Sequence, residues 1–182
     1  MKIALFQLPV GTDSTTNVNQ AVVAIKLAKA KNPDLKLAIL SECFNGPYGI
    51  DNFAKFAEKI PEGSTCQALS KLAKLLGIYI IGGSIIEKVD ELKLYNTCVV
   101  WSPDGKQIGK YRKMHLFDTN PLAGGVQFME SSALTPGNEL TIVEIEGRKL
   151  GIGICHDLRF PELARLYRKE GNKSPKTISK KF

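Results

Sequence analysis

Short apolar runs of strand length alternate with amphipathic segments over the first half of the chain. Residues 2–8 (KIALFQL) and 35–40 (LKLAIL) are such runs and predict buried strands. Residues 15–33 lie between them and end at a proline. The intervening segment carries apolar residues at helical spacing, namely Val18, Val22, Ile25 and Ala28. This alternation of strand, helix and strand narrows the choice of fold more than any other feature, because it is typical of layered α/β proteins.

The rest of the chain adds a second helix, two hairpins and a last helix. Residues 64–77 predict a helix with Ser64 as its N-cap and Gly77 at its end. Further elements are expected in this order: a strand over 78–87 that two glycines interrupt, a hairpin over 94–113 turning at SPDG, a hairpin over 140–155 turning at Glu146-Gly147, and a helix over 159–170 with Pro161 near its first turn. We therefore expect an α/β layered sandwich with a mixed sheet.

Cysteine usage and hydropathy exclude several classes of protein. No run approaches the ~20 apolar residues of a membrane span. The N-terminal MKIALFQLPVG has one basic residue and no small-residue cleavage site, so it predicts a first strand rather than a signal peptide. The four cysteines form neither a CxxC pair nor a Cys/His cluster, which argues against a zinc site and a secreted disulfide scaffold. A cytoplasmic, reducing compartment is the expectation.

Most of the net charge of +7 lies near the C-terminus. Residues 168–182 carry six basic residues against one acidic residue, a net +5, so the other 167 residues carry +2. Residues 171–182 (GNKSPKTISKKF) lack hydrophobic periodicity and are expected to form a disordered basic tail. Because the body of the chain is nearly neutral, we expect binding neither to nucleic acid nor to a membrane.

Three reactive side chains follow three different predicted strands. Glu42 follows LAIL, Lys113 follows KQIGKYR and Cys155 follows KLGIGI. Chemistry in α/β sheets tends to lie beyond the carboxyl ends of strands, so this acid, amine and thiol could converge. Each also has an ordinary interpretation, because a strand-end cysteine is commonly a small buried apolar residue and charged loop residues are commonly solvated. Packing roles are expected for the remaining cysteines, Cys43, Cys66 and Cys98.

The surroundings of Cys155 favour a nucleophile. The strand before it alternates glycine with isoleucine (GIGIC), which permits close backbone approach, and a tight polar turn and a helix follow. A thiol near a helix N-terminus lies close to partial positive charge, which favours the thiolate. The backbone N–H of His156 could point into the same site as an oxyanion donor. A redox role for Cys155 is disfavoured, since no resolving cysteine lies nearby in sequence.

Several motifs give the chain a resemblance to one family. GIGICHDLRFPELAR resembles the nucleophile segment of the nitrilase (carbon–nitrogen hydrolase) superfamily, ILSECFNGPYG resembles its acidic segment, and GKYRKMHLFD resembles its lysine segment. YNTCVVWSPDGK, IPEGSTCQALSKLAK and ESSALTPGNEL are similar to the omega-amidase branch. The resemblance runs from Lys2 to about Arg168. It implies a nitrilase-like α-β-β-α sandwich, with residues 1–170 forming the N-terminal part of a carbon–nitrogen hydrolase domain.

The resemblance implies a role for each of the three strand-end residues. Cys155 would attack an amide carbonyl as the nucleophile, and Glu42 would accept the thiol proton as general base. Lys113 would stabilise the tetrahedral oxyanion as an ammonium. Ammonia would leave, and water activated by Glu42 would then release a carboxylic acid from the thioester.

Three supporting residues follow from the same resemblance. Glu130 in FMESS matches a second acid that helps to position the lysine. His156 stands where the resembling proteins carry tyrosine, but only its backbone N–H is needed for the oxyanion. Arg159 is predicted either to contact a substrate carboxylate or to anchor Glu162 or a neighbouring loop.

The resemblance also implies substrates, partners and location. It implies small dicarboxylic acid monoamides such as alpha-ketoglutaramate and succinamate, no cofactor, no metal, a homodimer, and a cytoplasmic location with mitochondrial presence also compatible. Domains of this family run to roughly 250 residues or more, so we expect a fold that is incomplete on its C-terminal side. Two hypotheses stay open: an omega-amidase-type hydrolase, or a truncated, inactive chain that at most binds full-length subunits.

Overall fold

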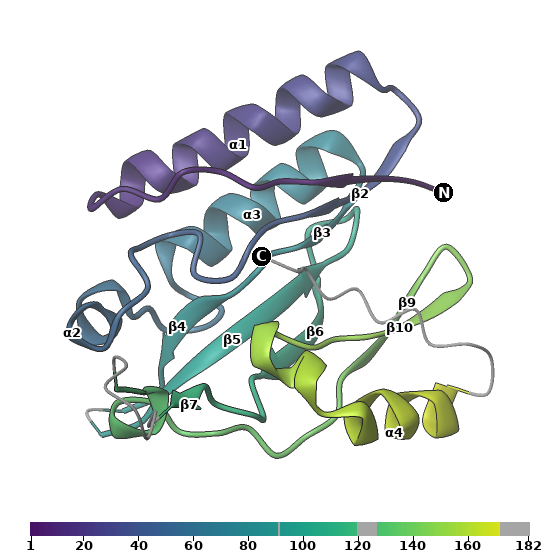
Figure 1. The fold of residues 1–182 in the computed structure, drawn as a ribbon. Coiled ribbons are helices and arrows are strands. Elements are labelled where there is room, and N and C mark those ends of the chain that lie inside the picture. Colours follow the sequence, from purple (N-terminus) through teal and green to yellow (C-terminus); the bar gives the residue numbers. More distant parts are fainter. Residues whose placement is uncertain (91, 120–126, 172–182) are drawn as a thin grey trace.

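Strands joined by helices form the first part of the molecule, and hairpins followed by a last helix form the rest (Figure 1). The computed structural model describes residues 1–90, 92–119 and 127–171. Its helices and strands in chain order are β1 Lys2–Leu5, α1 Ser14–Lys31, β2 Leu35–Ile39, α2 Ile50–Phe53, α3 Ser64–Leu76, β3 Tyr79–Ile81, β4 Ile85–Lys88, β5 Leu94–Trp101, β6 Gln107–Arg112, β7 Asp118–Thr119, β8 Phe128–Met129, β9 Ile142–Ile145, β10 Arg148–Gly151 and α4 Pro161–Gly171. Three short 3₁₀ turns are η1 Ala54–Phe56, η2 Glu130–Ser132 and η3 Cys155–Arg159.

The main sheet is mixed, which confirms the prediction from the alternation of strands and helices. β1, β2 and β3 pair in parallel, because α1 and α3 supply the crossovers that parallel neighbours need. β5 then pairs antiparallel with β3, β4 and β6. The order along the sheet is β1-β2-β3-β5-β4, with β6 also paired to β5. The chain therefore places the carboxyl ends of β2 and β6 in one sheet.

Gly82 and Gly83 divide the predicted strand over 78–87 into two. β3 ends before them, and β4 begins two residues after them on the next stretch of β5. Gly83 has a φ of +59°, and a Cβ added there would lie 1.9 Å from the backbone oxygen of Ser41. Glycine is required because this backbone passes directly against the turn that follows β2.

The prediction of a buried strand over residues 2–8 is wrong in length and in burial. β1 covers only Lys2–Leu5, and Ile3 and Leu5 are 42% and 61% exposed. β1 pairs with β2 alone among the described strands, so it is an edge strand of the sheet. The apolar run in the sequence could not distinguish an edge strand from a central one, because period and composition are the same for both.

α3 begins and ends at glycines. Its N-cap is Gly63 rather than the predicted Ser64, and glycine carries no side chain to accept a hydrogen bond. The Glu58 carboxylate supplies the acceptor instead, because it receives the backbone N–H of Thr65 at 2.9 Å. The predicted end is confirmed, since Gly77 closes the helix in the left-handed conformation with φ 60°.

Both predicted hairpins are present. β5 and β6 pair antiparallel around a turn in which Gly105 N–H donates to the oxygen of Ser102 at 2.9 Å. β9 and β10 pair around Glu146 and Gly147, which both have positive φ (51° and 69°). The last helix begins at Pro161 rather than at residue 159, because the residues after the second hairpin form the separate turn η3.

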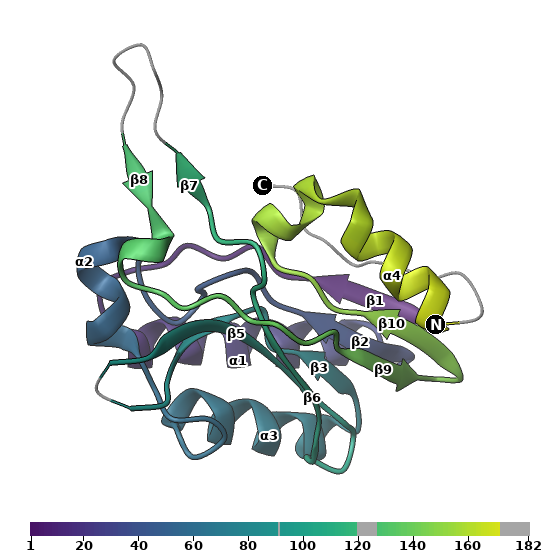
Figure 2. The same cartoon turned by 90° about the horizontal axis from the view of Figure 1, so that it is seen from below.

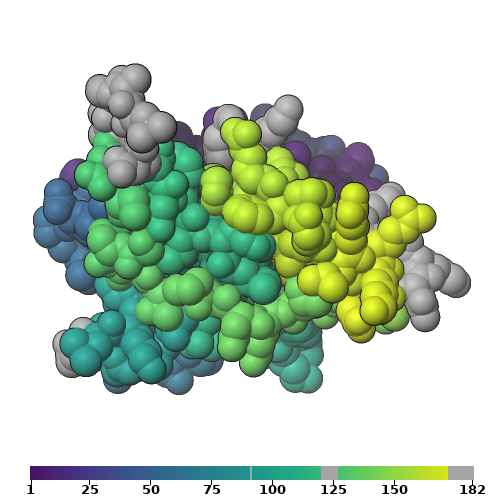
Figure 3. All heavy atoms as spheres, turned by 60° about the horizontal axis from the view of Figure 1, so that its bottom comes forward, coloured from purple at the N-terminus to yellow at the C-terminus, as the bar shows by residue number. Residues whose placement is uncertain are grey.

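Two of the apolar clusters in the described part of the chain stack these elements into four layers. One core lies between helices α1 and α3 and one face of the main sheet, and the other lies between the opposite face and the β9–β10 hairpin. α4 covers the outside of the hairpin (Figures 2 and 3), where the Tyr167 hydroxyl donates to the oxygen of Ile152 at 2.5 Å and its ring lies against Gly151. The order is helix, sheet, sheet, helix, which confirms the predicted α-β-β-α sandwich; the second sheet has two strands in the described part of the chain.

One prediction falls largely outside the described residues. The sequence predicts a basic tail over 171–182, and only Gly171, the last residue of α4, is described. Among the helices of the described part, none combines the length and apolar character needed to cross a bilayer.

Gly83 and Gly147 both have positive φ, but only Gly83 lies against another backbone, that of Ser41. The pair therefore gives a matched test of this close approach. Gly83→Ala should lower the free energy of unfolding by about 3 kcal/mol or more, because the added methyl group would clash with Ser41 as well as strain the backbone. Gly147→Ala should lower the free energy of unfolding by only about 1 kcal/mol, because no atom lies within 4 Å of the added Cβ and only the backbone is strained. Urea denaturation of both variants measures the two losses. Equal losses of unfolding free energy would contradict the close packing of Gly83 against Ser41.

Candidate active site

Four side chains from four separate segments meet at one end of the main sheet. Glu42 lies in the turn after β2, Lys113 follows β6 directly, Glu130 begins η2 and Cys155 begins η3. Three of these positions are the predicted strand ends, and Glu130 is the predicted second acid. The structure therefore brings together the acid, amine and thiol that the sequence places far apart.

The Lys113 ammonium is held between two carboxylates inside the protein. Its side chain has no exposed surface, and its Nζ lies 3.0 Å from Glu42 Oε1 and 3.0 Å from both oxygens of Glu130. Burial alone would lower the pKa of Lys113, but the two carboxylates together raise it above its ordinary value. Lys113 is therefore a fixed positive charge at neutral pH.

Glu130 is fully buried and shares its oxygens among several donors. Its Oε1 accepts from the Tyr48 hydroxyl at 2.7 Å, and its Oε2 accepts from the backbone N–H of Phe117 at 2.5 Å. Burial and the charge of Glu130 both raise the pKa of Tyr48, so the phenol keeps its proton and stays a donor. Tyr48 stacks on Phe128 at a centroid separation of 5.4 Å, which ties the loop after Glu42 to β8.

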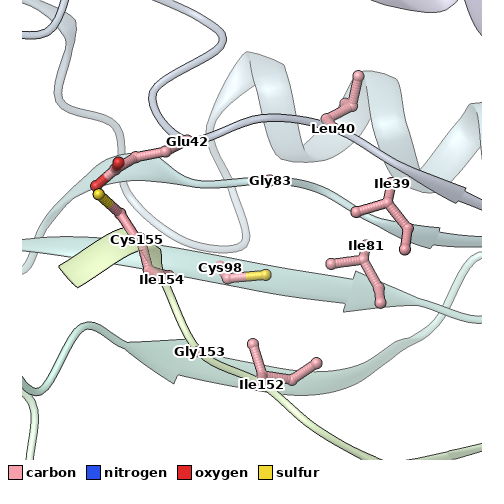
Figure 4. A pocket seen from close by; sticks show the side chains of 10 residues that line it. All are labelled: Ile39, Leu40, Glu42, Ile81, Gly83, Cys98, Ile152, Gly153, Ile154 and Cys155. Carbon is pink, nitrogen blue, oxygen red and sulfur yellow. The ribbon is translucent and has the colours of Figure 1, made fainter. Parts of the chain in front are cut away.

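The Glu42 carboxylate lies between the amine and the thiol. Its side chain is 11% exposed, and Oε1 accepts from Lys113 and from the Asn96 amide at 2.8 Å. Figure 4 shows the sulfur of Cys155 next to this carboxylate. A proton can therefore pass from the thiol to the carboxylate without a change of fold.

Cys155 occupies a strained position and keeps its proton. Its φ is +45°, uncommon for a residue with a side chain, and it is the exposed one of the four cysteines. Partial burial and then the negative charge of Glu42 raise the pKa of the Cys155 thiol to about 11, against a smaller opposing effect of Lys113. The expectation that a helix N-terminus favours the thiolate is wrong, since η3 is a single short turn and the nearest charge is negative.

Asp157 ties the turn that carries Cys155 to the segment that carries Lys113. Its Oδ2 accepts from the Tyr111 hydroxyl at 2.7 Å and from the backbone N–H of Ile154 at 2.9 Å. Its Oδ1 accepts from the backbone N–H of His115 at 2.9 Å and lies 2.7 Å from Nδ1 of the same residue. Tyr111 and His115, which lie two residues before and two residues after Lys113, are thereby fixed to the nucleophile turn.

His156 and Arg159 differ in how closely they belong to the site. His156 packs edge-on against Phe117 and Phe160, and burial lowers the pKa of its imidazole. Its backbone N–H stands at the start of η3, where the first N–H groups of a helix lack internal partners. Arg159 is exposed and forms no ion pair with Glu162 or any other described residue, so the anchoring role proposed from the sequence has no contact to support it.

A small apolar cavity of about 40 Å³ opens between the two sheets beside Cys155. Figure 4 shows Ile39, Ile81, Cys98 and Ile152 deeper in the cavity, with Glu42 and Cys155 at one end. Cys98, Cys43 and Cys66 are all buried in packed surroundings, as the sequence predicts. Across the described ranges no cluster of three His, Cys, Asp or Glu side chains could hold a metal ion.

Sequence reasoning missed the residues that hold the four principal side chains in place. Asn96, Tyr48 and Asp157 are each bonded to one of the predicted residues or to its turn. A usable signal existed for Asn96, because asparagine disfavours strands and yet interrupts an apolar run in LYNTCVVW. Nothing comparable marks Tyr48 or Asp157, whose contacts depend on how distant loops fold.

Comparison with known proteins gives a consistent result over nearly the whole chain. Residues 2–173 match the family described as carbon-nitrogen hydrolase. Omega-amidase NIT2 of Xenopus tropicalis is 46% identical over 170 residues, and the human omega-amidase NIT2 is 45% identical. The crystal structure of Saccharomyces cerevisiae Nit3, a member of branch 10 of the nitrilase superfamily, superposes with a TM-score of 0.83 at 39% identity.

The match covers unequal shares of the compared chains. The alignment to the two omega-amidases includes 93% of this chain and 60% of each relative, and the alignment to Nit3 includes 94% of this chain and 61% of that chain. The chain thus spans about 60% of the length of the relatives that it matches. The match over residues 2–173 and the shared fold establish that the chain belongs to the carbon–nitrogen hydrolase family, within the nitrilase superfamily.

Proposed function

We propose that this chain carries an omega-amidase-type site, which cleaves the terminal amide of small dicarboxylic acid monoamides to acid and ammonia. The observation that carries the proposal is the contact of Cys155 with a carboxylate that also holds a buried lysine. Amides are poor electrophiles, so their cleavage needs a strong nucleophile and a fixed positive charge near the developing oxyanion. These side chains supply both requirements without a cofactor.

In the first half-reaction the thiol and the carboxylate act together. Because the pKa of Cys155 lies near 11, the thiol is protonated at neutral pH, and Glu42 takes the proton as sulfur attacks the amide carbon. The oxyanion that forms is stabilised by the Lys113 ammonium and by the backbone N–H of His156. Glu42 then returns the proton to the amide nitrogen, the carbon–nitrogen bond breaks, and ammonia leaves a thioester behind.

In the second half-reaction Glu42 acts on water. The carboxylate accepts a proton from a water molecule as its oxygen attacks the thioester carbon. The carbon–sulfur bond breaks, the thiol of Cys155 regains the proton, and the carboxylic acid is released. Glu130 keeps Lys113 in place throughout, because both of its carboxylate oxygens lie 3.0 Å from the ammonium nitrogen.

The substrate class follows from the omega-amidase relatives. The name omega-amidase supports a terminal amide as the reacting group, and alpha-ketoglutaramate and succinamate are the substrates that we propose. Arg159 is exposed near the nucleophile turn, so its guanidinium is free to receive the distal carboxylate. A cytoplasmic location and a homodimer stay predictions.

Ammonia release from succinamate by the purified chain tests the proposal. We expect turnover that Cys155→Ala abolishes, because no other described thiol is exposed to replace it. Size-exclusion chromatography of the same samples shows whether the chain is monodisperse. A monodisperse chain without turnover would contradict the proposal and favour the alternative of an inactive chain that binds full-length subunits, which co-purification with such subunits would then test.

Titration of the Cys155 thiol tests the coupling of thiol and carboxylate. The negative charge of Glu42 contributes to the raised pKa of about 11, so Glu42→Gln should lower the midpoint of thiolate absorbance while it abolishes turnover. Glu144→Gln makes the same chemical change at an exposed position on β9 and should alter neither. An unchanged midpoint in Glu42→Gln would show that the two groups are not coupled.

A further inference from the structure

Asn96 is a buried amide that uses only part of its hydrogen-bonding capacity. The residue lies on β5 with no exposed surface, and its Nδ2 donates to Glu42 Oε1 at 2.8 Å. Its Oδ1 is buried as well, and no described residue donates a hydrogen bond to it. A buried acceptor without a partner destabilises the fold, so packing alone does not account for an asparagine here.

Two side chains donate to the same oxygen of the Glu42 carboxylate. Asn96 Nδ2 and Lys113 Nζ both donate to Oε1, at 2.8 and 3.0 Å. An oxygen that accepts two hydrogen bonds, one of them from a cation, has little remaining capacity to take a further proton. Oε2 is therefore the oxygen left to accept the proton of Cys155.

Asn96 also fixes the segment that carries the lysine. Its backbone oxygen accepts from the backbone N–H of Lys113 at 2.8 Å, directly after β6 ends. The same residue thus contacts the acid through its side chain and the amine through its main chain. Through these two contacts, Asn96 sets how Glu42 and Lys113 lie relative to each other.

We infer that Asn96 is a positioning residue for proton transfer, which occupies Glu42 Oε1 together with Lys113 and so leaves Oε2 as the base. The inference rests on the proposed function, in which Glu42 accepts the thiol proton. The titratable groups that act on or face Glu42 are Lys113, Cys155, Cys43, Tyr48 and, beyond the lysine, Glu130. The Asn96 amide, unlike these groups, does not titrate, so replacing it changes hydrogen bonding without removing a titratable group or a charge.

Asn96→Leu is the principal test, because leucine is close in size and keeps the backbone contact to Lys113. We expect the melting temperature to stay level or rise, since the orphaned acceptor is removed. We expect kcat/KM at neutral pH to fall roughly 10-fold, and the acid limb of its pH profile to move up by about one pH unit, because the ionised Glu42 carboxylate loses a donor.

A second readout does not depend on amide turnover. The rate at which iodoacetamide alkylates Cys155, followed by mass spectrometry against pH, also requires the ionised carboxylate and should show the same displaced acid limb. Thr97→Val is the matched control, because it removes an equally buried hydrogen bond, from Thr97 to Glu87 at 2.8 Å, one residue along the same strand. The control should leave both pH profiles in place.

The outcomes separate the inference from the proposed function. A shifted alkylation profile in a chain that releases no ammonia would retain the positioning role and reject the amidase proposal. A folded Asn96→Leu variant with unshifted profiles would overturn the inference. If that variant does not fold, Asn96→Asp keeps the size of the side chain and places a second carboxylate against Glu42; it should shift the acid limb further in the same direction, and an unshifted profile there would overturn the inference equally.

Discussion

A fully buried ammonium between two carboxylates is the interaction on which the rest of the structure depends. Lys113 and Glu130 have no exposed side-chain surface, and Glu42 has little. Removing any partner from such a group would leave an uncompensated charge inside the protein, at a cost of several kcal/mol. The turn after β2, the end of β6 and η2 must therefore arrive at the same place for the chain to fold. The four-layer arrangement is the means by which they do so, because the mixed sheet aligns the first two and β8 leads directly into the third.

Backbone conformations close to the charged group are unusually demanding. Cys43, directly after Glu42, has φ 47°, and Cys155 has φ 45°. Gly83 adds a third position with positive φ, and its backbone passes against the turn that carries the acid. Non-glycine residues adopt this conformation only where their surroundings enforce it, and such positions concentrate at functional sites. The buried charges and the packed cores around them supply that enforcement.

The sequence predicts the layers of this fold better than it predicts the edges. Hydrophobic period and turn residues predict the helices, both hairpins and the mixed sheet, since those signals are local. They do not predict that β1 lies at an edge, that Glu58 caps α3 or that Gly83 packs against Ser41, because each depends on a neighbour distant in sequence. The candidate site shows the same division. Strand ends and motifs predict where Glu42, Lys113 and Cys155 lie. The raised pKa of the thiol follows from its partial burial and then from the charge of Glu42, and only the folded chain brings these about.

The contacts of Asp157 have a consequence for protein engineering. One carboxylate binds the turn before Cys155 and two residues that flank Lys113, so these segments share a single mechanical unit although about 40 residues separate them. Grafting the nucleophile turn alone onto another scaffold would leave Asp157 without its partners and the turn without its anchor. The smallest portable unit is the end of β6 with its following residues, together with η3. A designer who wished to move this thiol would have to carry both strand ends and the carboxylate that joins them.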